Sequence, residues 1–415
     1  MTLRPLTSLL LLSLLGACSS SSSSPGASSP PGTDGGGGDD GGTSSGTSLP
    51  PPAAGHGIQL TMETTIAAST EDERCKFVQT TEDLWVNSEQ IRYTPGSHHF
   101  LLYHTPYTSI PTADKNGNPV DTSGVFDCPD GGPAAYFNVD RGLGGAQSPD
   151  APSVIGGLPS DVAVHIPSGS VLALDLHVLN ASMKPLDVTV VMNLNTIPQS
   201  QAKVEAGVYF FYNPFIRVPA GAKSQARMSC PVTSDVTIVN GQTHMHKQGL
   251  GGVANLEDSS GNVMQQLYAS QTWVDPPVKV WSPGMTMSAG QQIDFLCNYQ
   301  NAGTTDVIQG LSAAKNEMCV YAGAYYPRDT TFENCTGATY IGTGAASGAT
   351  TLQCMGAVSP SDPNFDDNYF GCVVNSCPKI AKPLTAFINC ELQNGSSSQT
   401  ACATQYESVQ TAACQ

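Results

Sequence analysis

Two histidines separated by one residue, His244 and His246, stand in the segment NGQTHMHKQG at residues 240–249. Side chains on a β-strand alternate between the two faces, so both imidazoles are expected on the same face. Two imidazoles on one face indicate a metal site, and both copper and zinc accept this ligand. The pair alone leaves the metal and its remaining ligands open.

A second histidine pair, His98 and His99, follows Pro95 and Gly96 in the segment TPGSHH. Adjacent residues on a regular strand face opposite ways, so both can reach one ion only where the strand is kinked or just starting. The preceding Pro-Gly turn predicts such a place. The alternative is two surface histidines in a loop. His104 shares strand parity with His98 and is an alternative ligand of the same ion.

The other histidines differ in their surroundings. His177 lies in LDLHVLN among apolar residues, where a single histidine is more often part of the core than a ligand. His56 falls in a linker, and His165 precedes Ile166-Pro167 in a structural context. What favours a metal is the combination of HH, one strand histidine and H-x-H in one chain.

The segments that must position these side chains read as short β-strands. Between residues 56 and 351, runs such as HHFLLYH, SVLALDLHVL and LDVTVVMNLN alternate with turns rich in Gly, Pro, Asn and Asp. The prediction is an all-β fold of antiparallel, jelly-roll-like sandwiches, and about 295 residues favours two in tandem. The segment NTIPQSQAKVEAG is the candidate boundary, giving one domain at 56–203 and another at 204–350.

The C-terminal segment, residues 351–415, has a different composition. It contains six cysteines and a stretch, CPKIAKPLTAFINCELQ, with helix-like spacing. We expect a small, cysteine-rich, partly helical appendage stapled by disulfides. The sequence does not fix the pairing, because six cysteines allow 15 connectivities. The cysteines are Cys354, Cys372, Cys377, Cys390, Cys402 and Cys414.

The N-terminus reads as an export signal. Residues 1–18 have a basic start and a short apolar run, and they end in LGAC, which resembles the bacterial lipoprotein box with Cys18 as the lipidated residue. Residues 19–55 are rich in Ser, Gly and Pro and predict a disordered tether. The expected location is the cell envelope, lipid-anchored to the membrane (the outer membrane first), or extracellular.

Charge and cysteine usage narrow the class of protein further. The formal net charge is −17 without a Lys/Arg cluster, which argues against nucleic acid as a partner. Setting Cys18 aside, twelve of the 13 cysteines remain, an even number that is typical of an oxidised, exported chain.

Four motifs in order carry a family resemblance: GSHHFLLYH, LALDLHVLN, GQTHMHKQG and NEMCVYAGAYY. Over about residues 57–340 the chain resembles the copper type II, ascorbate-dependent monooxygenases, which include the peptidylglycine α-hydroxylating and dopamine β-hydroxylating enzymes. The resemblance implies two jelly-roll-like domains with one copper each. It also implies the disulfides Cys75–Cys128, Cys230–Cys335 and Cys297–Cys319.

The resemblance further implies two sets of copper ligands. His98, His99 and His177 hold a copper that stores and passes an electron, and His244, His246 and Met318 hold the catalytic copper that binds dioxygen and substrate. A thioether is a soft ligand that suits Cu(I), which agrees with Met318. Composition alone does not choose it over Met285 or Met287. Ascorbate or a similar one-electron donor is the implied reductant.

The implied activity is hydroxylation of a C–H bond in a small substrate. The sequence differs from the peptide-amidating members of the family at the positions where those enzymes bind substrate. Gln242 stands in place of their carboxylate-binding arginine, and Val320 and Ala322 replace their Asn and Tyr. A neutral amide cannot replace a bidentate guanidinium, so the sequence favours a neutral or apolar substrate. Asp175 occupies a family glutamine position without an assigned role. The alternatives are a non-catalytic, copper-scavenging surface lipoprotein and a zinc hydrolase built on HH and His177.

Overall fold

The computed structural model describes residues 48–128, 131–147, 153–359, 361–395 and 398–414. The expected signal peptide at 1–18, with Cys18, and most of the expected tether at 19–55 lie outside the described residues. Within the described ranges, no helix has both the length and the apolar character needed to cross a membrane.

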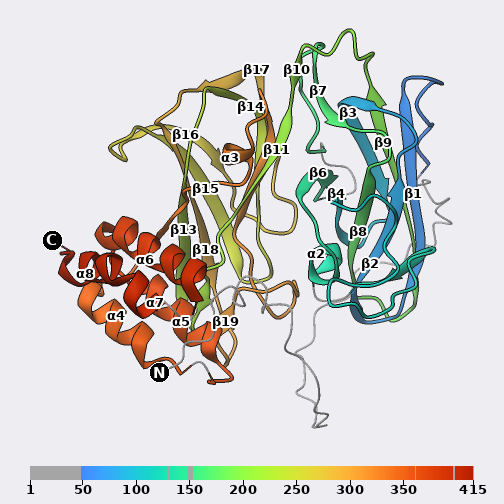
Figure 1. Cartoon of the computed structure of the whole chain (residues 1–415). Coiled ribbons are helices and arrows are strands. Elements are labelled where there is room, and N and C mark those ends of the chain that lie inside the picture. The colour runs from blue at the N-terminus through green and yellow to red at the C-terminus, as the bar shows by residue number, and fades with distance from the viewer. Residues whose placement is uncertain (1–47, 129–130, 148–152, 360, 396–397, 415) are drawn as a thin grey trace, which may run out of the picture.

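The N-terminal half contains two five-stranded sheets that share one core (Figure 1). In spatial order, the first sheet consists of β1 (Gly57–Ile66), β9 (Leu186–Thr196), β3 (Leu84–Tyr93), β7 (Val162–Ile166) and β10 (Val204–Glu205). The second consists of β5 (Val125–Asp127), β2 (Thr70–Gln79), β8 (Val171–Asn180), β4 (Ser97–His104) and β6 (Arg141–Ala146). A short helix, α2 (Gly132–Tyr136), packs near β8 and β2.

The C-terminal half repeats this plan with a four-stranded and a five-stranded sheet around a second core. The four-stranded sheet is β11 (Gly207–Tyr212), β20 (Val320–Tyr326), β14 (Val236–His244) and β17 (Lys279–Met287). The five-stranded sheet is β16 (Val263–Ala269), β15 (Gly249–Glu257), β18 (Gln292–Gln300), β13 (Lys223–Pro231) and β21 (Thr339–Ile341). The strands β12 (Arg217–Val218) and β19 (Val307–Ile308) pair separately, and α3 (Thr330–Glu333) contacts β11.

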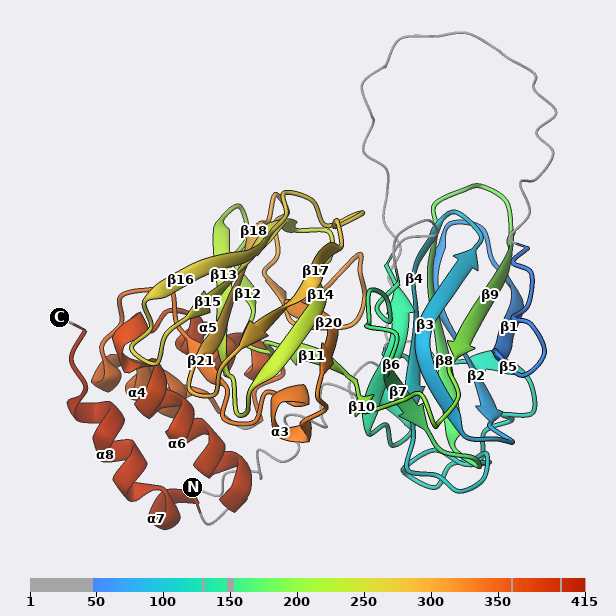
Figure 2. The ribbon, with the colours of Figure 1, turned by 90° about the horizontal axis from the view of Figure 1, so that it is seen from above.

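The two halves lie side by side, and the helical tail packs on the C-terminal half away from the N-terminal half (Figures 1 and 2). The tail comprises α4 (Gly348–Ala357), α5 (Phe365–Val374), η2 (Pro378–Ile380), α6 (Ala381–Asn394), α7 (Ser398–Ala401) and α8 (Ala403–Thr411). It has its own core and three disulfides, Cys354–Cys372, Cys377–Cys414 and Cys390–Cys402. The structure therefore selects one of the 15 pairings that the sequence left open.

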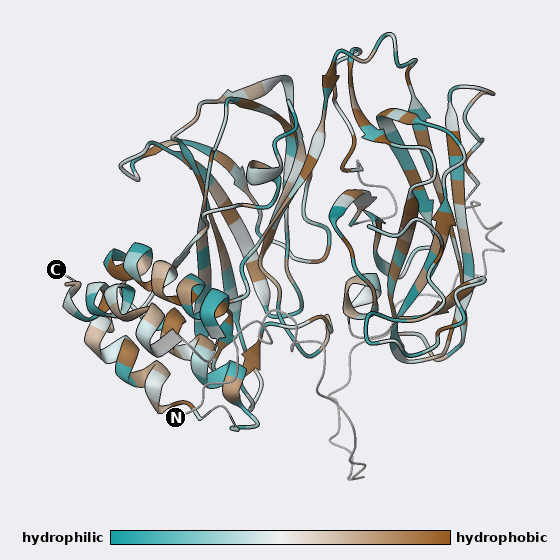
Figure 3. Ribbon diagram, in the orientation of Figure 1, coloured by the Kyte–Doolittle hydropathy of each residue, from teal (hydrophilic) through white to brown (hydrophobic). Residues whose placement is uncertain are grey.

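The strands form where the sequence alternates or is continuously apolar. Hydrophobic and hydrophilic residues alternate along the outer strands of the N-terminal half (Figure 3). β8 is different, because its even-numbered residues 172–178 join the core while Asp175 and His177 on the other face are also buried. That buried polar face of the second sheet is directed toward the C-terminal half.

The predicted disulfide partners are joined in the structure, as Cys75–Cys128, Cys230–Cys335 and Cys297–Cys319. The expected mostly β architecture with a cysteine-rich, partly helical C-terminus is confirmed. The finer expectation, two tandem jelly-roll-like sandwiches divided after residue 203, stays a prediction.

Candidate metal centre

The HH dipeptide lies at the irregular start of β4. His99 pairs with His177 of β8, but the pairing slips by one residue between positions 97 and 99, which makes a β-bulge at His98. A bulge changes the direction of a side chain, and Gly96 at φ 99° provides the turn that precedes it. The predicted kink is therefore present, and it allows His98 and His99 to reach one cluster with His177, their ligand atoms lying within 4.8 Å of one another.

The H-x-H segment lies at the end of β14 rather than within it. The strand ends at His244, and His246 follows outside the strand, so the expectation that one regular strand carries both was wrong in part. The two rings nevertheless lie 5.1 Å apart between centroids. Met245 between them is 1% exposed and belongs to the second core.

All five of these histidines meet in one group, called here the histidine cluster: His98, His99, His177, His244 and His246. His98 is at its centre, with its ring centroid 5.2 Å from His177, 5.3 Å from His244 and 5.9 Å from His246. Among the described residues, two triads made only of histidines have ligand atoms within 4.8 Å, and His98 belongs to both. The sequence predicted two separate ligand sets, and it gave no sign that they adjoin.

Burial determines the charge of the cluster. It lowers the pKa of His98, His99 and His244 well below the ordinary value, and neighbouring imidazoles lower it further. Burial likewise lowers the pKa of His246, to about 4. These four rings are therefore neutral at pH 7, and a metal ion needs the neutral form.

Two side chains of the N-terminal half fix two of the rings, one in each half. The Oε1 atom of Gln147, at the end of β6, lies 2.8 Å from Nδ1 of His244 and accepts its proton, which leaves Nε2 free. Glu71 on β2 lies 2.9 Å from Nε2 of His177 and also accepts from Ser312 Oγ at 2.8 Å. Glu71 thus joins an N-terminal histidine to the loop that leads to Met318.

The charge state of Glu71 follows from these contacts. Burial raises its pKa, but hydrogen bonds from His177, Ser312 and the Ala313 amide, together with the His177 charge, lower it to about 2. A carboxylate that is ionised and shared between both halves is a strong acceptor for all three donors.

A further contact between the halves comes from β14. The side-chain amide of Asn240 donates to the carbonyl oxygens of Val154 and Gly156 at 2.8 and 2.9 Å, and its own oxygen accepts from the Ala324 amide. Asn240 is 2% exposed, so these bonds are shielded from water. The two halves therefore meet through the buried contacts of Asn240 as well as through Glu71.

Asp175, whose role the sequence left unassigned, forms a buried carboxyl pair with Glu73 beside His99. Burial raises the pKa of both groups, and for Asp175 the adjacent Glu73 raises it further. Burial therefore favours the protonated form of these two carboxyl groups. The pair lies between His99 and the glycine turn at Gly131, whose amide donates to Glu73 at 2.9 Å.

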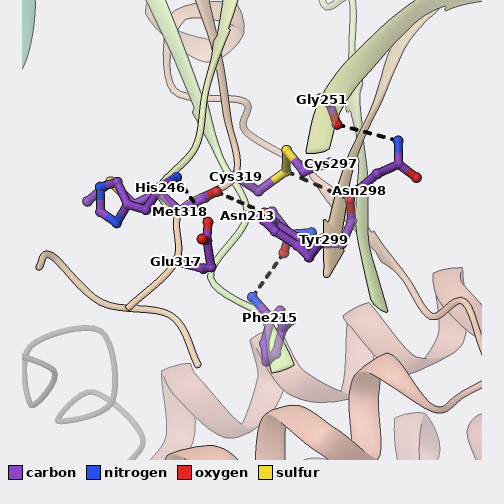
Figure 4. The surroundings of a disulfide bond; sticks show 11 residues. Asn213, Phe215, His246, Gly251, Cys297, Asn298, Tyr299, Glu317, Met318 and Cys319 are labelled. Carbon is purple, nitrogen blue, oxygen red and sulfur yellow. Dashed lines mark hydrogen bonds between the residues drawn. A yellow bond between two sulfur atoms is a disulfide. The ribbon is translucent and has the colours of Figure 1, made fainter. Parts of the chain in front are cut away.

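The segment Glu317-Met318-Cys319, called here the E-M-C segment, holds the H-x-H loop through hydrogen bonds. Glu317 is fully buried, and its two oxygens accept the backbone N–H groups of His246 at 3.0 Å and Gln248 at 2.5 Å. The Asn316 carbonyl lies 3.2 Å from Nδ1 of His246 and accepts its proton. Met318 therefore follows directly on residues bonded to the H-x-H loop, and it is half-buried (Figure 4).

Cys319, the next residue, pairs with Cys297 on β18 (Figure 4). Tyr299 fixes the same segment by donating its hydroxyl to the Met318 carbonyl at 2.8 Å. The disulfide turns the Cys319 side chain toward β18. The sequence gave no sign of the role of Glu317, which is to accept hydrogen bonds from the backbone of the H-x-H loop.

The remaining histidines are engaged elsewhere. Nδ1 of His104, the alternative ligand, lies 2.8 Å from Asp140, and its Nε2 lies 3.2 Å from Ser170. His165 stacks on Trp85 with ring centroids 4.1 Å apart. Neither belongs to a ligand triad among the described residues.

The histidine cluster fits copper. Within the described part of the chain, Nε2 of His98, Nδ1 of His99 and Nε2 of His246 are buried without hydrogen-bond partners, as expected for atoms that a metal satisfies. Imidazole nitrogen suits copper, whereas magnesium and calcium prefer oxygen. Hydrogen bonds to the second ring nitrogen of His244, His246 and His177 supply the orientation that metal-binding histidines usually have.

Comparison with known proteins bears on the C-terminal half. Residues 204–343 match the model of the family "Copper type II ascorbate-dependent monooxygenase, C-terminal domain". No curated protein matches the chain. Among solved structures, the major capsid protein P2 of bacteriophage PM2 is 11% identical with a TM-score of 0.26, covering 66% of this chain and 99% of that one. The infectious bursal disease virus Gt strain structure is also 11% identical, with a TM-score of 0.15, covering 68% and 76%.

Proposed function

We propose that the chain is a copper-dependent monooxygenase that hydroxylates a C–H bond of a small substrate, using dioxygen and a one-electron donor such as ascorbate. The observation that carries the proposal is the convergence of HH, the β8 histidine and H-x-H in one buried cluster. The match of residues 204–343 to the copper monooxygenase family supports the same conclusion.

The ligands divide according to the sequence motifs. His98, His99 and His177 would hold one copper, and His244, His246 and Met318 the catalytic one. Redox copper supplies single electrons to dioxygen, which the protein side chains cannot do. The protein fixes the geometry: Glu317 and Asn316 orient His246, and Gln147 sets the tautomer of His244.

The architecture we infer is two tandem jelly-roll-like sandwiches, residues 56–203 and 204–350, with the cluster between them. Supporting this division, each pair of sheets has its own core, and the chain passes to the second pair just after β10, which still pairs with β7 of the first. The tail at 351–415 has a third core and supplies no residue to the cluster among the described residues.

The substrate class follows from Gln242. It occupies the position of a carboxylate-binding arginine, it is 5% exposed, and its Oε1 atom is buried without a hydrogen-bond partner in the described structure. A buried amide has no charge to offer a carboxylate. We infer a neutral or apolar substrate with a hydrogen-bond donor at this point.

We also propose that Cys18 is lipidated and that the folded part is tethered to the cell-envelope membrane. Membrane partition of the mature chain, abolished by Cys18→Ser, tests this idea. A Cys18→Ser protein that is processed normally yet stays with the membrane would exclude the anchor.

The activity is tested by copper analysis of the purified protein followed by oxygen uptake with ascorbate and candidate substrates. The proposal expects bound copper and substrate-dependent oxygen consumption that His244→Ala abolishes. Copper binding with no turnover on any neutral or carboxylate substrate would favour a copper-scavenging surface protein. His104→Ala is the matched control, because that imidazole is bound to Asp140 and Ser170 instead.

A further inference from the structure

The position of His98 raises a question that the separate ligand sets do not answer. A ring nitrogen of His98 lies within 4.8 Å of ligand atoms of His244 and His246, and a ring nitrogen of His98 also lies within that distance of ligand atoms of His99 and His177. His98 comes from the N-terminal half, whereas His244 and His246 come from the other. A triad that crosses the boundary is therefore already assembled.

We propose that one copper ion is held across the two halves by His98, His244 and His246, as an alternative to the set built from His98, His99 and His177. The inference rests on the proposed copper function and concerns how that copper is held. Both triads include His98, but His98 can bind an ion in only one of them at a time.

The free ring nitrogens support the crossing triad. His244 and His246 both donate through Nδ1, to Gln147 and to the Asn316 carbonyl, so both have their Nε2 lone pairs available. Nε2 of His98 and Nε2 of His246 are buried without partners in the described structure. Two of the three rings are thus already oriented by hydrogen bonds of the kind that metal-binding histidines use.

The distances require only a small adjustment. Three atoms 4.8 Å apart lie no more than ~2.8 Å from their common centre, and bonds of ~2.0–2.1 Å to imidazole nitrogen need each atom to move by less than about 1 Å. Rotation of side chains provides such a shift without movement of the strands. No carboxylate belongs to this triad, which favours copper or zinc over magnesium or calcium.

The two triads exclude one another because a neutral imidazole has one acceptor nitrogen. An ion in the crossing triad leaves His99 and His177 without His98. An ion in this triad also links the two halves, in addition to the contacts of Asn240 and Glu71, so copper binding would strengthen the association of the halves.

A metal titration separates this arrangement from independent sites. In the full chain carrying His99→Ala, the N-terminal set is broken but the crossing triad is intact. Adding His98→Ala should then weaken binding of the first copper equivalent at least about 100-fold, because loss of an orienting partner alone typically costs 10–100-fold. His104→Ala in the same background is the control on the same strand and should leave the affinity unchanged.

Copper affinity is measured by competition with a chelator, and electron paramagnetic resonance of Cu(II) counts the coordinated nitrogens. The spectrum of His98→Ala should show one coordinated nitrogen fewer. If the alanine variant does not fold, His98→Asn is used in its place. Affinity and spectrum independent of His98 would overturn the crossing triad while leaving the proposed function in place. Failure of the unaltered protein to bind copper would overturn both.

Discussion

Removing the Glu317 carboxyl group, whose pKa burial raises to about 8, should loosen the H-x-H loop without touching a ligand atom. The two oxygens accept the backbone N–H groups of His246 and Gln248, and the Glu317 side chain is fully buried. Glu317→Ala leaves both buried N–H groups without an acceptor. Each unsatisfied group costs about 1–3 kcal/mol, so the expected destabilisation is about 2–6 kcal/mol.

Glu317→Gln provides the graded comparison. The amide oxygen keeps one of the two N–H bonds, and its NH₂ group cannot accept the other. The loss should therefore be about half that of the alanine variant, about 1–3 kcal/mol. Urea unfolding measures both values, and copper titration should show a 10- to 100-fold weaker His246-dependent site for Glu317→Ala.

Two results would refute this account of Glu317. One is an alanine variant as stable as the unaltered protein, which would mean that the loop amides find other acceptors. The other is equal loss for alanine and glutamine, which would place the effect on charge rather than on the number of accepted bonds.

Three other perturbations give separate tests. Burial raises the pKa of Glu89 from 4.5 to about 7, so the folded state binds more protons than the unfolded state between these values, and stability falls as pH rises through that window by about 3 kcal/mol. Glu89→Gln should lack this slope in urea unfolding at pH 4.5 and 8; an unchanged slope would contradict the assignment. Met318→His should keep copper but lose most oxygen uptake, because a third imidazole favours Cu(II) over Cu(I). Met245→Leu, a change in the core, should keep both copper and oxygen uptake. Normal turnover by Met318→His would exclude Met318 as the thioether ligand. Glycine-extended peptides should bind about 30- to 150-fold more weakly than to an enzyme with a carboxylate clamp, since Gln242 lacks the 2–3 kcal/mol of a bidentate guanidinium; efficient amidation would show that another residue binds the carboxylate.

Sequence alone was sufficient where local patterns carry the information. Strand alternation predicted a mostly β chain, and the spacing of HH, His177 and H-x-H identified the residues that the structure gathers. The Pro-Gly turn before HH predicted the irregular strand start, which the slipped pairing of β4 with β8 shows. These features depend on neighbours within a few positions, which is why they were readable.

The contacts between the halves were not readable, because they join residues far apart in the chain. Gln147 and His244 are separated by 97 positions, and Glu71 and Ser312 by 241. Neither glutamate nor glutamine at such positions differs in the sequence from an ordinary exposed strand residue. Met245 is 1% exposed, so Met245→Leu, which keeps an apolar side chain in the core, is the suitable control for Met318→His.

Irregular pairing explains how two different histidine motifs reach one cluster. At β4 the bulge lets adjacent His98 and His99 act together, although a regular strand would separate them. Relative to β20, β14 has one extra residue between Ile238 and Gln242, and Asn240, which lies in this irregular stretch, donates to the other half. A regular continuation of either strand would turn these side chains to the opposite face. The metal centre therefore depends on two register shifts, and a change that restores regular pairing at either one should disperse the cluster even with every ligand retained.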